Sequence, residues 1–473
     1  MKQIQPWHWR SLPLEHRTGS DVFESLFLSS EGIATLLESP SASLPAPSPL
    51  ARYSICAGAP RLIEGSPQMW TPLIGGILPC LRHLLQRAKV NLHSESRDVG
   101  SLPFTGGWLG WLGYDLAWEI EELPVLKTDL LPLPPAFWYE PASFAVLDHE
   151  EQTLWLASTC EAELDVLQQQ LDQEKISSTL LVTDLQADAS LPYFFTPQAD
   201  YEDAVRQAKK YIQAGDIFQA NLSLRFTTQT TANSWSIYRA LQQINPSPFA
   251  SYWQTPWGCV ISCSPERLVQ LQGSQAQTRP IAGTRSRGAT PEQNQQLQQE
   301  LIANVKERAE HIMLVDLERN DLGRVCEWGS VAVNELLTIE EYSHVMHLVS
   351  NVIGTLRSNC DAIDLIRALF PGGTITGCPK VRCMEIIEEL EPLRRNLFYG
   401  SCGYLDWRGN LDLNILIRTL LLSHEGSGQS RVWGQVGAGI VADSDPEKEW
   451  YESLHKAQAQ LAALQMVNQQ LRL

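Results

Sequence analysis

The segment KERAEHIMLVDLERND, residues 306–321, combines a run of apolar residues with two closely spaced acids. It has the character of a helix, and its apolar run should pack inward. Glu307 and Glu310 are three positions apart, so their carboxylates lie on one helix face, about one turn apart. Because two neighbouring negative charges repel each other, the pair raises the question of which positive group it holds.

A second acidic pair lies near the end of the chain, in the segment DSDPEKEWYESLHKAQAQL at 443–461. Asp445 is suited to cap a helix there, and Glu449, Glu452 and Lys456 then fall within a narrow arc of one face. A solvated acidic face explains either pair alone. Two such pairs on separate helices, each beside apolar sequence, favour a shared site. Four oxygen ligands without Cys or His suit Mg²⁺.

Bulk composition restricts the class of protein. The chain has 473 residues and a formal charge of −18, so its long-range field repels nucleic acid and anionic lipid. Ten cysteines without a CxxC pair argue against zinc and are typical of thiols in a reducing compartment. Neither a membrane-length apolar run nor a secretory signal is evident, which predicts a cytoplasmic protein without a membrane partner.

Strand-like and helix-like segments alternate along the chain, which predicts an α/β protein of the α+β type. We expect an N-terminal region at 1–175, a linker at 176–197 and a catalytic domain at 198–465. Helices are expected at 196–216, 291–321, 379–391 and 446–468, with Gly215 as the cap of the first.

Three further features bear on the chemistry. The Gly-rich turn that runs into a helix at 370–392 offers backbone N–H groups to an anion, although a tight loop without a ligand explains it equally well. Cys378 and Pro379 stand where a P-loop needs Lys and Ser/Thr, so a carboxylate fits better than a nucleotide phosphate. Arg418 falls within an apolar strand at 412–422, and its partner is either a structural acid or a substrate carboxylate.

Together these segments resemble component I of anthranilate synthases and aminodeoxychorismate synthases, which are chorismate-utilising enzymes. The resemblance covers nearly all of residues 196–460 and extends more loosely to the N-terminal region. The segments that carry it are GDIFQANLSLRF, ISCSPERL, TRPIAGTRSRG, ERAEHIMLVDLERND, SHVMHLVS, PGGTITGCPKVRCMEIIEELEP, GSCGYLDW, LNILIRTL and GQVGAGIVADSDPEKEWYE.

The resemblance implies a fold in which two large antiparallel sheets pack together with helices outside. It implies chorismate, a dicarboxylate, as the substrate. It also implies Mg²⁺ as the cofactor, held by Glu307, Glu310, Glu449 and Glu452. Glu266 matches the general acid that protonates the departing C4 hydroxyl group. The implied substrate-binding residues are Gly283, Thr284, Thr374, Tyr404, Arg418, Gly437, Ala438, Gly439 and Lys456.

Two more residues have roles implied by the resemblance. His347 lies near the reacting ring, although a structural histidine is an equal alternative. Gln219 matches the position where water-adding relatives carry a Lys base. Because Gln is no base at neutral pH, ammonia is the implied nucleophile. No GxCxG elbow is present, so a separate glutamine amidotransferase subunit is the expected ammonia donor.

Two aminating branches of the family are compatible with these motifs. Many aminodeoxychorismate synthases carry a nucleophilic Lys at the position of Ala282. Anthranilate synthases carry Ala there, as this chain does. Other local features, among them QANLS, NPSPFASYW and FPGGTITG, resemble the aminodeoxychorismate branch, which we favour. The anthranilate branch and a catalytically idle tryptophan-binding subunit stay open, although the complete set of acids together with Arg418 argues against the idle subunit.

A tryptophan pocket is implied in both branches, formed by the segments LLES and NPSPF. A strand turn without a ligand is the alternative, and such a pocket does not decide the branch. The expected pocket residues are Glu38, Ser39, Pro246, Ser247, Pro248 and Phe249.

Overall fold

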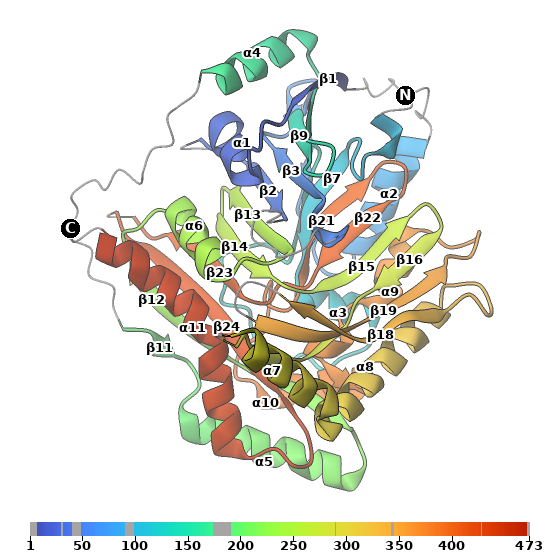
Figure 1. Cartoon of the computed structure of the whole chain (residues 1–473), viewed down its shortest axis with the longest axis vertical. Coiled ribbons are helices and arrows are strands. Elements are labelled where there is room, and N and C mark those ends of the chain that lie inside the picture. Colours follow the sequence, from blue (N-terminus) through green and yellow to red (C-terminus); the bar gives the residue numbers. More distant parts are fainter. Residues whose placement is uncertain are drawn as a thin grey trace.

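Two large antiparallel sheets organise the chain (Figure 1). Within the described residues the first sheet contains twelve strands and the second contains ten, which confirms the predicted architecture. The computed structural model describes residues 7–29, 32–39, 49–89, 99–173, 191–288, 290–341, 345–426 and 428–470.

Each sheet follows a single strand order with one branch. The first runs β1 (His8–Pro13), β10 (Thr153–Ser158), β9 (Ser143–Asp148), β3 (Tyr53–Ala57), β2 (Ala34–Glu38), β13 (Phe249–Thr255), β14 (Gly258–Ser264), β23 (Thr419–His424), β24 (Ser430–Ile440), β12 (Gln219–Thr230) and β11 (Tyr193–Phe194), with β20 (Gly377–Cys378) beside β12. The second runs β17 (Ile281–Ser286), β19 (Val345–Thr355), β16 (Gln275–Thr278), β15 (Arg267–Gln272), β22 (Leu411–Asn414), β21 (Ser401–Asp406), β7 (Gly107–Leu112), β8 (Ala136–Tyr139) and β6 (Met69–Trp70), with β18 (Ala332–Glu341) beside β19. A short hairpin pairs β4 (Leu62–Ile63) with β5 (Ser66–Pro67).

Both sheets combine strands from the two ends of the chain. In the first sheet β2 pairs with β13, and in the second β7 pairs with β21. The N-terminal region and the catalytic region expected from the sequence therefore share both sheets and one core. Residues 174–190, which include most of the expected linker, lie outside the described residues.

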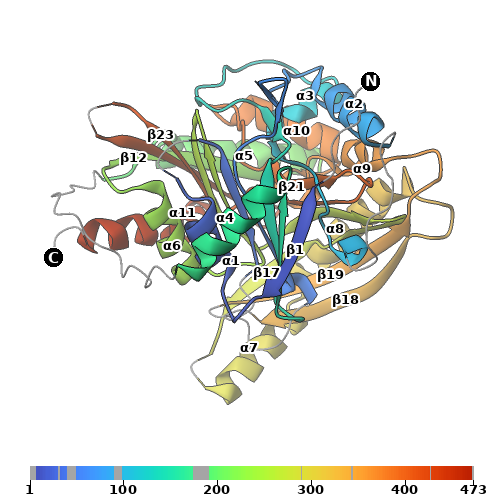
Figure 2. The ribbon, with the colours of Figure 1, turned by 90° about the horizontal axis from the view of Figure 1, so that it is seen from above.

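Helices pack on the outer faces of the sheets (Figure 1). Helix α11 contacts β24 of the first sheet, whereas α8 contacts β17 and β19 of the second. Figure 2 shows α2, α3 and α10 on the side opposite α7. The α-helices are α1 (Gly19–Leu26), α2 (Ile77–Lys89), α3 (Ala117–Ile120), α4 (Glu161–Asp172), α5 (Gln198–Ala214), α6 (Ser234–Ile244), α7 (Pro291–Ala303), α8 (Val305–Gly323), α9 (Ala362–Leu369), α10 (Lys380–Leu390) and α11 (Pro446–Gln470). The 3₁₀ helices are η2 (Pro49–Ala51), η3 (Val99–Ser101), η4 (Tyr114–Leu116) and η5 (Gly373–Ile375).

The expected helices form with ends within two residues of the prediction, and one of them is divided in two. Gly215 ends α5 in the left-handed region at φ 83°, as its lack of a side chain permits. The segment 291–321 forms two helices instead of one, because Asn304 between them is extended and breaks the hydrogen-bond ladder. Helix α10 begins one residue later than predicted, with Pro379 as its N-cap. Among the helices that the structure describes, none combines the length and apolar character that crossing a membrane requires.

Aromatic side chains fill the space between the two sheets. Trp253 projects from β13 of the first sheet and meets Trp111 of β7 in the second, edge to face, with ring centroids 5.8 Å apart. Both side chains are fully buried. Large rings packed in this way contribute strongly to stability because each removes a large apolar area from water.

We expect Trp253→Ala to lower the free energy of unfolding by about 3–5 kcal/mol, since it opens a cavity between the sheets. Trp328→Ala is the matched control, because Trp328 is 99% exposed and its removal should change stability by less than about 0.5 kcal/mol. Urea unfolding followed by circular dichroism measures both variants. Equal unfolding midpoints for the two would contradict this account of the core.

Candidate active site

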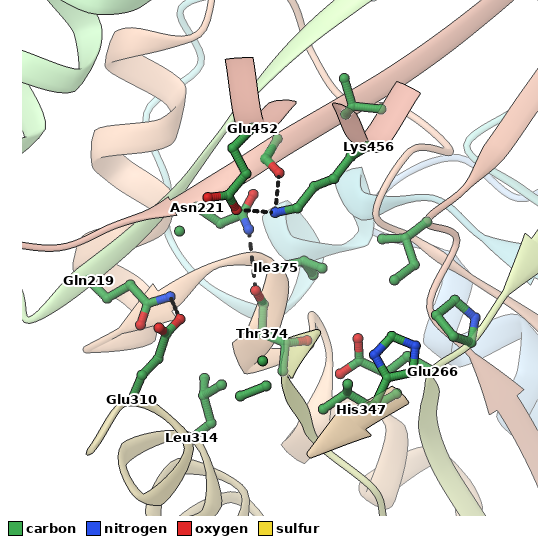
Figure 3. A pocket seen from close by; sticks show the side chains of 18 of the residues that line it. Gln219, Asn221, Glu266, Glu310, Leu314, His347, Thr374, Ile375, Glu452 and Lys456 are labelled. Atoms are coloured by element: carbon green, nitrogen blue, oxygen red, sulfur yellow. Dashed lines mark hydrogen bonds and ion pairs between the residues drawn. The ribbon is translucent and has the colours of Figure 1, made fainter. Parts of the chain in front are cut away.

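A cavity of about 570 Å³ lies where the helices of the two sheets approach each other. Helix α8 contributes Glu307, Glu310 and Leu314 to its wall, and α11 contributes Glu449 and Glu452. Figure 3 shows Glu310 on one side of the cavity and Glu452 above it. The structure thus brings the two acidic pairs, more than a hundred residues apart in the sequence, into one cavity.

Polar side chains contact Glu307, Glu310 and Glu452. Nη2 of Arg285 lies 2.7 Å from Oε1 of Glu307. Nε2 of Gln219 donates to Oε1 of Glu310 over 2.8 Å (Figure 3). Nζ of Lys456 lies 2.9 Å from Oε1 of Glu452. These contacts offset part of the repulsion among the acids.

The donor set suits a hard divalent cation, because all four side chains offer carboxylate oxygens. The buried Oε2 of Glu307 has no hydrogen-bond partner among the described residues, so one oxygen is available to a cation. However, no three acidic, His or Cys side chains in the described ranges form a ready-made metal cluster. Glu310 and Glu452 would bind a dication in competition with their present contacts to Gln219 and Lys456.

Glu266 occupies the turn between β14 and β15 and also lines the cavity. Burial raises the pKa of its carboxyl group to about 8, and the nearby charge of Glu318 contributes to the increase. Glu266 is therefore mostly protonated at neutral pH. A buried, protonated carboxyl group that faces a cavity can donate a proton to a ligand there.

His347 projects from β19 beside Glu266 (Figure 3). Burial, together with the positive charge of Arg418, lowers the pKa of its imidazole to about 3. The ring is therefore neutral at physiological pH. It adds hydrogen-bonding capacity to the cavity without adding charge.

Arg418 corrects one expectation, because it does not lie within a strand. It sits in the link between β22 and β23 with a φ of 51°, and this irregular backbone brings its side chain to the cavity wall. Its Nη1 donates to Oδ1 of Asn245 over 3.2 Å, and burial lowers the pKa of the guanidinium group. No carboxylate in the described part of the chain lies within ion-pair distance of it. The cavity therefore contains a cation with no structural acid as its partner.

Most of the other predicted substrate-binding residues also line this cavity, namely Gly283, Thr374, Gly437, Gly439 and Lys456. Ala438 points to the opposite side of β24, into the apolar core, as strand alternation requires. The backbone of Thr284 pairs with His347 across β17 and β19, and its side chain lies outside the described part of the structure. Tyr404 lines a different cavity.

The structure adds residues that the sequence interpretation did not include. Tyr399 lines the cavity, and its buried hydroxyl has no hydrogen-bond partner among the described residues. Arg285 pairs with Glu307, and Asn221 faces the cavity beside Thr374 (Figure 3). Arg285 lies within the quoted segment TRPIAGTRSRG, where a cation close to a predicted acidic site was a usable signal. Tyr399 had no such signal.

A family model described as chorismate binding enzyme matches residues 52–462. The chain belongs to this family. It is 61% identical over 98% of its length to the anthranilate synthase component I-like protein of Synechocystis sp., covering 93% of that protein. Aminodeoxychorismate synthase component 1 of Bacillus subtilis is 46% identical over 78% of this chain and 79% of its own. Anthranilate synthase component 1 of Synechocystis sp. is 43% identical over 77% of each chain.

The solved structures agree with this assignment. Anthranilate synthase component I from Streptococcus pneumoniae superposes with a TM-score of 0.72 at 30% identity, covering 94% of this chain and 99% of the other. This member of the chorismate-binding family is therefore an enzyme that uses chorismate, as its sequence motifs predicted.

A second cavity of this chorismate-utilising enzyme, of about 120 Å³, lies between β2, β13 and β21. Of the expected tryptophan-pocket residues, Glu38, Ser39, Pro248 and Phe249 line it, whereas Pro246 and Ser247 do not. The Glu38 carboxylate is already bonded within the protein, accepting from Ser20, Tyr238 and Gln242. That this cavity binds tryptophan stays a prediction.

An apolar groove of about 1210 Å³ runs along α8 on the outside of the enzyme. Gln219, Glu310 and Val441 line both this groove and the first cavity, so they form a shared wall. Large apolar side chains are exposed along it, including Phe218 at 68% and Ile312 at 40%. Exposed apolar residues gathered in one groove are typical of an interaction surface.

We expect Glu266→Gln to become more stable relative to the native protein as the pH rises. Because the folded-state pKa of Glu266 is raised from 4.5 to about 8, its contribution is fully present below pH 4.5 and is lost as the pH approaches 8. The isosteric amide cannot ionise, so the difference should reach the order of a few kcal/mol at pH 8. Urea unfolding at several pH values measures it. Glu300→Gln, an exposed control on α7, should show no such trend, and parallel curves for the native protein and Glu266→Gln would refute the raised pKa.

Proposed function

We propose that this enzyme replaces the C4 hydroxyl group of chorismate with an amino group derived from ammonia, giving 4-amino-4-deoxychorismate for p-aminobenzoate and folate synthesis. One observation carries the proposal: a buried, protonated Glu266 faces the same cavity as Arg418, a cation without an acidic partner. This arrangement supplies both an acid for a poor leaving group and a receptor for a carboxylate. Chorismate offers both groups.

The side chains divide the work of binding. Arg418 is suited to a bidentate bond with one substrate carboxylate. Gly437 and Gly439 let a substrate approach the backbone of β24 closely, and a Cβ on Gly437 would lie 2.9 Å from the Tyr399 hydroxyl. That hydroxyl is a further donor to a substrate oxygen. Water is displaced from the cavity as the substrate binds, which strengthens each of these contacts.

Proton transfer follows from the protonation state of Glu266. In the net reaction the C4–O bond breaks as Glu266 gives its proton to the departing hydroxyl group, which leaves as water. The lone pair of ammonia forms the C4–N bond, and the resulting ammonium group gives up one proton, so that Glu266 is protonated again in the net reaction. Gln219 does not act as a base, but its buried Oε1 has no partner among the described residues and can accept an N–H of ammonia, orienting it. Ala282 lines the cavity and offers no nucleophile, so a covalent adduct at that position is excluded.

Magnesium is the cofactor we propose, bound by Glu307, Glu310, Glu449 and Glu452. When bound, it supplies positive charge that neutralises these acids and holds a substrate carboxylate. The orphaned Oε2 of Glu307 and the oxygen-only donor set support this choice. Without the ion, Arg285 and Lys456 neutralise the same acids in part.

The choice of product rests on the relatives. Synechocystis sp. has both an anthranilate synthase component I-like protein and a protein named anthranilate synthase component 1. This chain is 61% identical to the first and 43% to the second, which supports a group distinct from that anthranilate synthase. The 46% identity to the aminodeoxychorismate synthase of Bacillus subtilis agrees. Ala282 and the many similar anthranilate synthases favour the second candidate, anthranilate formation with release of pyruvate.

One assay separates these products: incubation with chorismate, Mg²⁺ and an ammonium salt. We expect a product that yields p-aminobenzoate only after a lyase is added. Fluorescent anthranilate together with pyruvate would establish the second candidate. If no turnover occurred under any condition, the remaining candidate would be a tryptophan-binding subunit without catalytic activity.

We further expect Glu310→Gln to reduce turnover by at least about 10²-fold while the fold stays intact, because a charged oxygen is lost from the proposed magnesium site. Initial rates at saturating chorismate measure the effect, and circular dichroism checks the fold. Glu300→Gln, an exposed glutamate on α7, is the matched control and should retain full activity. An undiminished rate in Glu310→Gln would remove this residue from the site.

The proposed ammonia donor is a glutamine amidotransferase subunit, docked on the apolar groove along α8. The groove fits this partner because it shares a wall, formed by Gln219, Glu310 and Val441, with the proposed catalytic cavity. Ammonia released there would travel a short path and remain shielded from bulk water.

We expect Phe218→Ala to weaken the glutamine-dependent reaction about tenfold or more, because a large apolar contact is lost at the interface. The reaction with added ammonium salt should be unchanged, since it needs no partner. Tyr193→Ala is the control, because Tyr193 is 63% exposed and lies outside the groove. Equal loss of both reactions in Phe218→Ala would place the defect in the active site instead.

A further inference from the structure

Glu318 is a buried acid on α8 to which the proposed reaction assigns no role. It is 4% exposed, and its Oε2 is buried without a hydrogen-bond partner among the described residues. Burial raises the pKa of its carboxyl group, and the charge of Asp321 raises it further. A buried carboxylate with an unsatisfied oxygen is costly, so its retention needs an explanation.

The nearest cation, Lys380, offsets the charge of Glu318 only in part, because it is paired with Asp321. Nζ of Lys380 lies 2.6 Å from Oδ2 of Asp321 and donates to the carbonyl oxygen of Leu369 over 2.8 Å. Lys380 is thus bound to another acid and to the backbone. Glu318 is left as the member of this cluster without a cation of its own.

Glu318 lies directly behind the wall of the catalytic cavity. A Cβ placed on Gly373 would be 3.4 Å from its Oε1, and the next residue, Thr374, faces the cavity close to Glu266 (Figure 3). The charge of Glu318 reaches Glu266 across this thin wall. Two carboxyl groups this near each other in a dry interior, with no cation between them, cannot both ionise easily.

The other charged or titratable groups around this pair do not change that balance. Asp321 on α8 adds negative charge, and Lys380 on α10 is already held by it. On the cavity side, His347 of β19 is neutral. Arg418, in the link between β22 and β23, also lines the cavity. Ionisation of Glu318 therefore disfavours ionisation of Glu266.

We propose that Glu318 is a positioning residue that keeps Glu266 in its protonated, proton-donating form. It touches no substrate and acts only through Glu266. The inference rests on the proposed function, because it assigns Glu318 a part in the acid step of that reaction. It adds a second carboxyl group to the acid site. It also gives a reason for the buried charge cluster of Glu318, Asp321 and Lys380 behind η5.

The test compares Glu318→Gln with the native enzyme over a range of pH. The amide preserves the shape but carries no charge, so Glu266 should lose its proton at lower pH. We expect the alkaline limb of the kcat/KM profile to move down by about one pH unit, with activity above that limb reduced about tenfold and KM for chorismate at pH 6 unchanged. Glu300→Gln is the control, since Glu300 is an exposed glutamate on α7; its profile should not move.

A second measurement does not depend on turnover. Infrared difference spectra against Glu266→Gln report the C=O band of the protonated Glu266 carboxyl group, and its titration should move in Glu318→Gln by the same amount as the kinetic limb. An unmoved band in folded Glu318→Gln would overturn the proposal even if the enzyme aminates chorismate. Conversely, a shifted band without any turnover of chorismate would retain the coupled acids and refute the proposed function alone.

Discussion

The cavity depends on bringing like charges together and then neutralising them. Glu307 and Glu310 come from a helix on one sheet, whereas Glu449 and Glu452 come from a helix on the other. Their mutual repulsion would push the two helices apart if it were not offset. Arg285, Lys456 and the packing of the sheets against each other provide this offset. The large aromatic core between the sheets therefore stabilises an arrangement that electrostatics alone opposes.

The same dry interior has opposite effects on the two titratable groups beside the reacting position. Burial disfavours the charged form of each, so the pKa of Glu266 rises while that of His347 falls. Both groups are consequently neutral at physiological pH. Arg418 retains its charge because its ordinary pKa is very high. The cavity thus keeps a fixed cation for binding an anion and a neutral acid for donating a proton, without a base that would take this proton back.

The sequence predicted the parts of this site that depend on local patterns. Helical spacing placed the two acidic pairs on their helices, and the predicted caps Gly215 and Asp445 marked the end of α5 and the start of α11. It could not predict features that depend on irregular backbone. Arg418 was expected within a strand but lies in a link with positive φ, and Tyr399, also at positive φ, was missed in favour of Tyr404, which lies in another cavity. Glu318 was not singled out, because its neighbours across the cavity wall come from distant segments.

Helix α8 explains how one site can contain acids with different surroundings, some beside hydrogen-bond donors or cations and one without an ion pair. Its residues Glu307, Glu310, Leu314 and Glu318 are spaced by three or four positions and so follow one stripe along the helix. At one end of the stripe, an arginine and an amide donate to the carboxylates. At the other end, Glu318 forms no ion pair within the described residues, and its charge opposes ionisation of Glu266. Leu314 separates the two ends with an apolar side chain. The placement of cations along this rigid element, more than the acids themselves, decides which carboxyl groups bind positive charge and which retain a proton.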